Sequence, residues 1–196
     1  MEYKEVELYI NEEGDWLEKI SLVEYPAIES NFLCFNREES FRFAVEEEQR
    51  IITGAVMIPN KRIIRLNERG DEYYVYFSAD TIKKAAHRWL QDNMNHSFNL
   101  EHGRSTKAVD VVESWIVNDS SNDKAASLGF DLPAGTWMMS CKVNDEELWN
   151  QIKEGKYNGF SVEGIFQYND DEKFNKTATY EESVIKEAEA FIASMS

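Results

Sequence analysis

The sequence predicts an α+β protein that is mainly β: an antiparallel β-barrel or strongly curved sheet with helices packed outside it. Roughly eight segments combine short length, apolar or alternating residues and flanking turn residues, which is typical of strands. Only about two or three segments have the apolar spacing of a helix. Strands and helices do not alternate regularly, which favours a barrel-like arrangement over a doubly wound parallel sheet.

The strand candidates follow one another along most of the chain. Residues 3–10 alternate like a half-buried strand, and a turn at Gly14 leads into a second strand over residues 16–23, so we expect an opening hairpin. An aromatic run makes residues 72–77 a strong candidate. The remaining candidates are residues 50–58, 63–66, 98–102, 109–117, 136–143 and 157–166.

Three segments have helical features. Asp80 is predicted to cap a helix over residues 81–93, which has an apolar face. Residues 145–154 begin with three acidic side chains, which suit the helix dipole, and Gly155 is the expected stop. Residues 181–194 form a third candidate, with apolar residues at helical spacing.

Composition limits the class of protein. The 196 residues suit one domain, predicted as residues 1–168, followed by a polar linker and a C-terminal helix or tail in residues 169–196. A formal net charge of −16 argues against binding to nucleic acid or to anionic membranes. The chain lacks a long apolar run and a signal-peptide pattern, so we expect a cytoplasmic protein. Cys34 and Cys141 form no metal pattern and no disulfide framework, and no metal or cofactor is expected.

One serine and one histidine carry candidate chemistry. Ser161 lies in a predicted strand, Gly-Phe-Ser-Val-Glu-Gly, whose glycines let another backbone or a substrate approach closely. A serine needs a general base to become a nucleophile, and His102, before a predicted turn, is the candidate. His87 and His96 are expected to be noncatalytic. The residues alone also allow a structural role, in which Ser161 makes a backbone hydrogen bond in a buried strand.

Six short motifs occur in order along residues 17–167. They are Ile-Ser-Leu-Val-Glu-Tyr-Pro-Ala at 20–27, Gly-Ala-Val-Met at 54–57, Leu-Glu-His at 100–102, Val-Glu-Ser-Trp-Ile-Val at 112–117, Gly-Thr-Trp-Met at 135–138 and Gly-Phe-Ser-Val-Glu-Gly at 159–164. Together they resemble the XkdF-type phage prohead proteases, which belong with the tailed-phage prohead proteases and the herpesvirus assemblins. The resemblance implies a herpesvirus-protease-like fold, an antiparallel β-barrel with peripheral helices.

The resemblance also implies an activity and its residues. It implies a serine endopeptidase that cleaves scaffold and capsid proteins during phage head maturation, with Ser161 in the family's nucleophile motif and His102 in the place of its base. In the family, a glutamate precedes a strand that lies after the nucleophile. Here the matching strand, residues 20–23, lies near the N-terminus, as if the chain were circularly permuted, and the preceding residue is Lys19, with Glu18 one position off.

Two further carboxylates are candidates for the third catalytic residue. Glu113 lies on the predicted strand after His102, so a hairpin could bring it to the imidazole, and we favour it. Glu163 lies two residues after Ser161 on the same strand face. A carboxylate bonded to the imidazole would hold its tautomer and stabilise the imidazolium.

The implied partners are the phage major capsid and scaffold proteins, with a second copy of the chain as a possible partner, inside the assembling prohead in the bacterial cytoplasm. The competing class is a noncatalytic head-assembly or scaffold-binding protein that retains the protease fold; a third is an unrelated acidic β-domain that binds protein. Catalysis requires Ser161 and His102 close together rather than on opposite faces. Residues 185–187 also resemble a sequence that some prohead proteases cut, which predicts self-trimming after Glu187.

Overall fold

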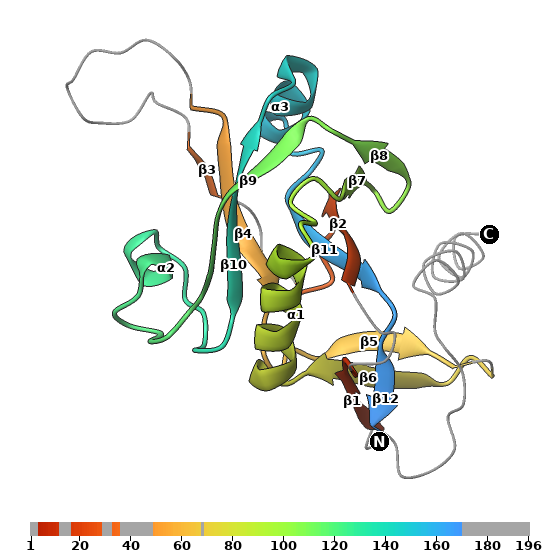
Figure 1. Ribbon diagram of the computed structural model, residues 1–196. Helices are drawn as coiled ribbons and strands as arrows, with labels where there is room; N and C mark the ends of the chain where they lie inside the picture. Colours follow the sequence, from red (N-terminus) through yellow and green to blue (C-terminus); the bar gives the residue numbers. More distant parts are fainter. Residues whose placement is uncertain (1–3, 12–16, 29–32, 36–48, 68, 170–196) are drawn as a thin grey trace.

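The computed structural model describes residues 4–11, 17–28, 33–35, 49–67 and 69–169, and these residues are mainly β (Figure 1). The predicted helix over residues 181–194 and the proposed cut after Glu187 lie outside the described residues. The helices are α1 (Ala79–Gln91), α2 (Lys124–Ser127) and α3 (Glu146–Lys153). The strands are β1 (Glu5–Tyr9), β2 (Leu17–Val23), β3 (Leu33–Phe35), β4 (Ile51–Met57), β5 (Ile63–Leu66), β6 (Glu72–Phe77), β7 (Phe98–Leu100), β8 (Arg104–Thr106), β9 (Val109–Ile116), β10 (Trp137–Val143), β11 (Gly159–Gly164) and β12 (Gln167–Asn169).

The described strands form three four-stranded sheets, with the orders β12-β1-β6-β5, β3-β4-β10-β9 and β11-β2-β7-β8. The prediction of a mainly β, α+β protein is confirmed. In the part of the chain that the structure describes, these sheets do not close into the predicted barrel. Two of the pairings, β1 with β6 and β2 with β7, are parallel rather than antiparallel.

The opening of the chain differs from the predicted hairpin. β1 lies between β12 and β6, whereas β2 lies between β11 and β7 in another sheet. The reason lies in β2, where residues 20–23 are all buried and both faces are therefore covered. A strand buried on both faces belongs inside a sheet with a neighbour at each edge, and a surface hairpin does not provide this.

The helix boundaries follow their capping residues. Ser78, and not the predicted Asp80, caps α1, because the Ser78 hydroxyl accepts the N–H of Thr81. α3 begins one residue later than predicted, after Asp145, whose carboxylate caps the helix by accepting the N–H of Leu148 at 2.7 Å. Two short elements occupy segments predicted as loop and turn: α2, and β8 directly after the β7 turn.

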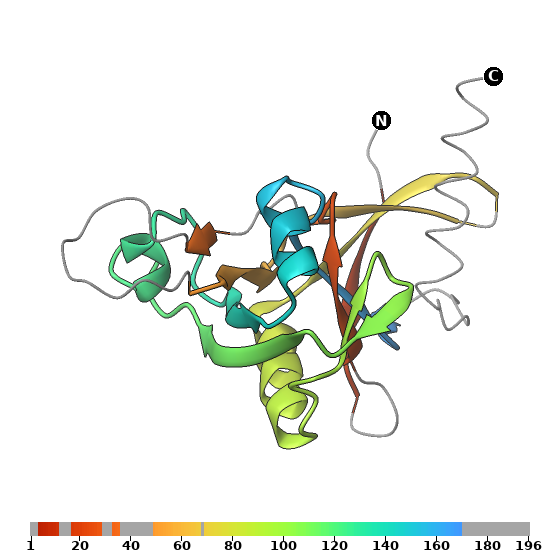
Figure 2. The ribbon, with the colours of Figure 1, turned by 90° about the horizontal axis from the view of Figure 1, so that it is seen from above.

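Helix α1 joins two of the sheets through one buried tryptophan. The Trp89 ring makes edge contacts with Phe98 of β7 and with Trp137 of β10, at centroid distances of 6.3 and 6.4 Å. All three rings are at most 1% exposed, so the core runs continuously between the two sheets. The β5–β6 hairpin extends at the opposite side of the molecule from α2 in both views (Figure 1 and Figure 2). Among the described helices, none combines the length and apolar character needed to cross a membrane.

Candidate active site

Three neighbouring strands place one row of polar residues across the sheet β11-β2-β7-β8. In register, Ser161 of β11 lies opposite Ser21 of β2, and Ser21 lies opposite Asn99 of β7. Each of these residues stands between two apolar residues, and alternation along a strand sends the polar and apolar side chains to opposite faces. The flanking Ile20, Leu22, Phe98 and Phe160 are at most 1% exposed. One face of the sheet therefore builds the core, and the other carries the polar row.

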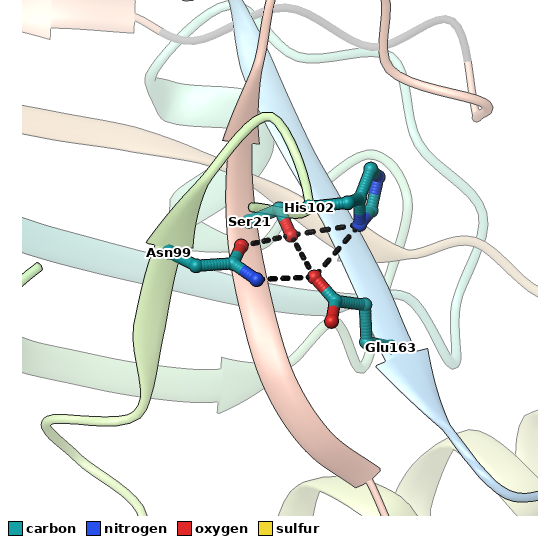
Figure 3. Close-up of polar contacts among 4 residues, drawn as sticks. All are labelled: Ser21, Asn99, His102 and Glu163. Atoms are coloured by element: carbon teal, nitrogen blue, oxygen red, sulfur yellow. Dashed lines mark hydrogen bonds and ion pairs between the residues drawn. The ribbon is translucent and has the colours of Figure 1, made fainter. Parts of the chain in front are cut away.

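A cluster of four polar side chains forms on that second face (Figure 3). The Ser21 hydroxyl lies 2.6 Å from Glu163 Oε1 and 2.9 Å from His102 Nδ1, and it also contacts Asn99 Oδ1. Glu163 Oε1 also accepts from Asn99 Nδ2 at 2.5 Å and lies 2.8 Å from His102 Nδ1. The side chains of His102 and Glu163 are only 11% and 10% exposed, so these contacts are shielded from water.

Glu163 is an ionised, acceptor-only group within this cluster. Its burial alone would raise its pKa, but hydrogen bonds from His102, Ser21 and Asn99 together outweigh burial and lower the pKa to about 2. An ionised carboxylate cannot donate, so its 2.8 Å contact with His102 requires the proton to be on Nδ1. In the neutral imidazole, Nε2 then carries a lone pair and can accept a proton.

His102 sits on a backbone turn that non-glycine residues rarely adopt. Glu101 and His102 have φ values of 49° and 54°, and the Gly103 N–H bonds to the Leu100 carbonyl at 3.0 Å, as in a type I′ turn. Two further bonds hold the turn against β2 and the residues after it: Glu101 N–H to the Leu22 carbonyl at 3.0 Å, and Glu24 N–H to Glu101 Oε1 at 2.7 Å. Such conformations cost about 1–3 kcal/mol each and concentrate at functional sites.

Ser161 lies on the same face of the sheet as this cluster. It stands directly opposite Ser21 and two positions before Glu163 on β11. Residues two positions apart on a strand, such as Ser161 and Glu163, are separated by about 6.6 Å. An imidazole that makes one hydrogen bond through each ring nitrogen can span this distance. Ser161 and His102 are therefore not on opposite faces, the arrangement that would have excluded catalysis.

The other predicted residues lie elsewhere. Glu113 is on β9, in a different sheet, where its carboxylate accepts from Lys124 Nζ and from Ser140 Oγ. The carboxylate hydrogen-bonded to His102 is Glu163, which takes the place expected for Glu113. Glu18 is exposed on β2.

The two remaining histidines are at the surface. His87 is exposed on α1, and His96, whose side chain is 71% exposed, pairs with Asp110 at 2.8 Å. Neither lies in the polar cluster.

Sequence reasoning missed Ser21 and Asn99. One signal could have identified them: an apolar–polar–apolar triplet occurs at residues 20–22, 98–100 and 160–162, and its central residues form the polar row. Three short strands with the same alternation are candidates for one amphipathic sheet.

A groove lies beside the His102 turn. It has a volume of about 390 Å³ and runs between the β7–β8 hairpin and α3. Arg104 and Lys156 contribute positive charge to it, and Glu101, Asp145 and Glu147 contribute negative charge. Its position beside the turn that carries His102 makes it a candidate binding surface for a peptide. Within the described residues, no group of three or more His, Cys, Asp or Glu side chains is placed to hold a metal ion.

Comparison with known proteins gives a match to a family model and to relatives from Bacillus subtilis. Residues 40–170 match the family model described as "Putative phage serine protease XkdF". The chain is 28% identical to the Phage-like element PBSX protein XkdF of Bacillus subtilis (strain 168) over 168 residues, which cover 84% of this chain and 51% of that protein. It is 27% identical to the Uncharacterized protein YqbD of the same strain over 205 residues, which cover 89% of this chain and 59% of that protein. The chain thus spans between half and three fifths of the length of these relatives. No solved structure matches significantly.

Proposed function

Since the chain belongs to the phage serine protease XkdF family, we propose that it is a serine endopeptidase with Ser161 as nucleophile, His102 as general base and Glu163 as the carboxylate that orients the base. The observation that carries this proposal is the 2.8 Å contact between Glu163 and His102 Nδ1, on the sheet face that also bears Ser161. Carboxylate, imidazole and hydroxyl are the three groups of the serine protease triad, which is recognised by geometry and roles rather than by fold.

Each group has one task in the proposed reaction. The Ser161 Oγ attacks the scissile carbonyl carbon while its proton passes to Nε2 of His102. The Glu163 carboxylate stabilises the imidazolium that forms, and the imidazolium then gives the proton to the leaving amine. Water, deprotonated by the same nitrogen, releases the acyl group from Ser161 and restores the starting state.

Ser21 contacts the imidazole directly, but it is not suited to be the nucleophile. It contacts Nδ1, the nitrogen whose proton is directed to Glu163, so this nitrogen cannot take up a second proton. Ser21 is also 0% exposed, whereas Ser161 is 6% exposed. A nucleophile must reach a substrate carbonyl, and this favours Ser161.

The substrates we propose are the phage scaffold and major capsid proteins, cut inside the assembling prohead. The groove beside the His102 turn would take substrate side chains close to the scissile bond. Its charges of both signs favour a peptide with polar side chains over a purely apolar one.

An active-site label and a cleavage assay test the proposal together. The full chain is treated with a fluorophosphonate and, separately, incubated with the scaffold and capsid proteins encoded beside it. We expect the label on Ser161 and cleavage of at least one of the two proteins. Ser161→Ala should abolish both, because it removes only the nucleophilic oxygen.

The control is Ser140→Ala, which removes a buried hydroxyl from another sheet and should leave labelling and cleavage unchanged. A label on Ser21 would transfer the nucleophile's role to that residue. Absence of both label and cleavage in a folded protein would favour the noncatalytic assembly protein instead.

A further inference from the structure

Two completely buried polar side chains in the sheet that carries the site have no task in the proposed reaction. Ser21 and Asn99 are both 0% exposed and lie side by side on the parallel strands β2 and β7. Burying a hydroxyl or an amide is costly unless its hydrogen bonds are made. Apolar residues at both positions would have extended the core pattern of these strands at no such cost, so their contacts indicate what they do.

All the contacts of these two residues described above lead to the imidazole–carboxylate pair or to each other. Asn99 Nδ2 and the Ser21 hydroxyl both approach the same oxygen, Glu163 Oε1, at 2.5 and 2.6 Å. The Ser21 hydroxyl also contacts Asn99 Oδ1, which fixes the orientation of the amide. The amide nitrogen then faces the carboxylate as a donor, as Figure 3 shows.

The hydroxyl proton can serve only one acceptor at a time. When Nδ1 of His102 carries a proton, the hydroxyl proton of Ser21 goes to Asn99 Oδ1 or Glu163 Oε1, and the Ser21 oxygen accepts from Nδ1–H. When Nδ1 carries a lone pair, that nitrogen is a third acceptor for the same hydroxyl proton. In that second arrangement Asn99 Oδ1 receives no proton from Ser21, and the Nδ1 lone pair faces the ionised carboxylate of Glu163 at 2.8 Å with no proton between them. The four side chains are therefore satisfied together only when Nδ1 of His102 carries the proton.

We propose that Ser21 and Asn99 are positioning residues, which hold the Glu163 carboxylate in place and thereby fix His102 as the Nδ1–H tautomer with its lone pair on Nε2. The catalytic consequence rests on the proposed function, whereas the tautomer itself can be measured without any reaction. A fixed tautomer matters because an imidazole in the wrong tautomer offers the nucleophile a proton instead of a lone pair.

The tautomer of His102 is the direct test. Long-range ¹H–¹⁵N correlation spectra of the full chain at pH 8 distinguish the two ring nitrogens, and His102→Ala assigns its signals among the three histidines. We expect the Nδ1–H form alone in the unsubstituted chain. Ser21→Ala and Asn99→Ala should each give a mixture of tautomers and lower kcat by about 10- to 100-fold, with KM nearly unchanged.

Three comparisons separate positioning from general stability. Ser140→Ala, which breaks a buried hydroxyl pair with Thr53 at 2.8 Å in another sheet, should alter neither the tautomer nor kcat. Ser21→Thr keeps a hydroxyl and should retain the Nδ1–H form. Adding Ser21→Ala to Glu163→Gln should change the tautomer ratio no further, because the serine acts through that carboxylate.

The outcomes are distinct from those for the proposed function. If the unsubstituted chain cleaves its substrates and Ser21→Ala and Asn99→Ala keep the single Nδ1–H tautomer, the positioning role is overturned and the protease remains. If the chain cleaves nothing but the two variants lose the tautomer, the positioning role stands and the protease proposal fails. A folded Ser21→Thr protein that behaves like Ser21→Ala would also overturn the proposal, because packing rather than the hydroxyl would then decide the tautomer.

Discussion

Replacing Glu163 by glutamine should remove a distinctive part of the protein's acid sensitivity. The donors around this carboxylate lower its pKa from the ordinary value of 4.5 to about 2, despite its burial. A group whose pKa is lower in the folded state stabilises the fold above its unfolded pKa, and this stabilisation is lost as the pH falls toward the folded pKa. Glu163 should therefore contribute fully at neutral pH, with a progressive loss between about pH 4.5 and pH 2.

The size of the effect follows from the two pKa values. A shift from 4.5 to about 2 corresponds to about 3 kcal/mol of stability at neutral pH. About 2 kcal/mol of this should already be lost at pH 3, where the unfolded carboxyl is protonated and the folded one mostly is not. Among the described residues, the titratable His102 contacts Glu163 and the charged Lys19 lies opposite it on β2, and both remain in the variant.

Urea unfolding of the unsubstituted chain and of Glu163→Gln at several pH values between 6 and 3 provides the measurement. The free-energy difference between the two proteins should shrink by about 2 kcal/mol across this range. Glu113→Gln is the matched control, since its half-exposed ion pair with Lys124 should contribute less than about 1 kcal/mol. A difference for Glu163→Gln that stays constant with pH would refute the hydrogen-bonded, ionised carboxylate.

Two further predictions concern catalysis. Ser161→Ala and His102→Ala should each lower kcat to a similar residual level, and the double variant should be little slower, because the proposed nucleophile and base act as a unit. Additive losses in the double variant would show that the two residues do not work together. Arg104 lines the groove, so Arg104→Glu should raise KM for a peptide substrate by about 5- to 10-fold with kcat nearly unchanged. The control is Arg62→Glu, at an exposed arginine paired with Glu5, which should change neither constant. Equal effects of the two substitutions would show that the groove does not bind substrate.

Local patterns in the sequence predicted local structure well. The alternation in β11, the acidic first turn of α3 and the stop at Gly155 each depend on residues that are close together in the chain, and each is present in the structure. Side chains alternate between the two faces of a strand, so Ser161 and Glu163, two positions apart, are predicted on one face. For this reason the sequence alone makes Glu163 a candidate for the orienting carboxylate.

The rest of the site depends on strand pairing that local patterns do not encode. Assigning β2 to a hairpin with β1 separated Ser21 from its true neighbours, because β2 pairs with β7 in parallel and with β11 in antiparallel fashion. The preference for Glu113 had a similar cause: the hairpin after His102 returns as β8, and β9 joins a different sheet. Which strands become neighbours is decided by burial of the whole sheet.

The long separations within the polar cluster also set when it can form. Ser21 is 78 positions from Asn99 and 142 positions from Glu163 along the chain. During synthesis β2 emerges long before β11, and contacts of such wide separation are slow to form. Any interruption of the chain between β2 and β11 would divide the four side chains between two fragments. A chain that ends before β11 would thus lack the four-residue cluster, and the proposed hydrolase activity would begin only once folding is finished.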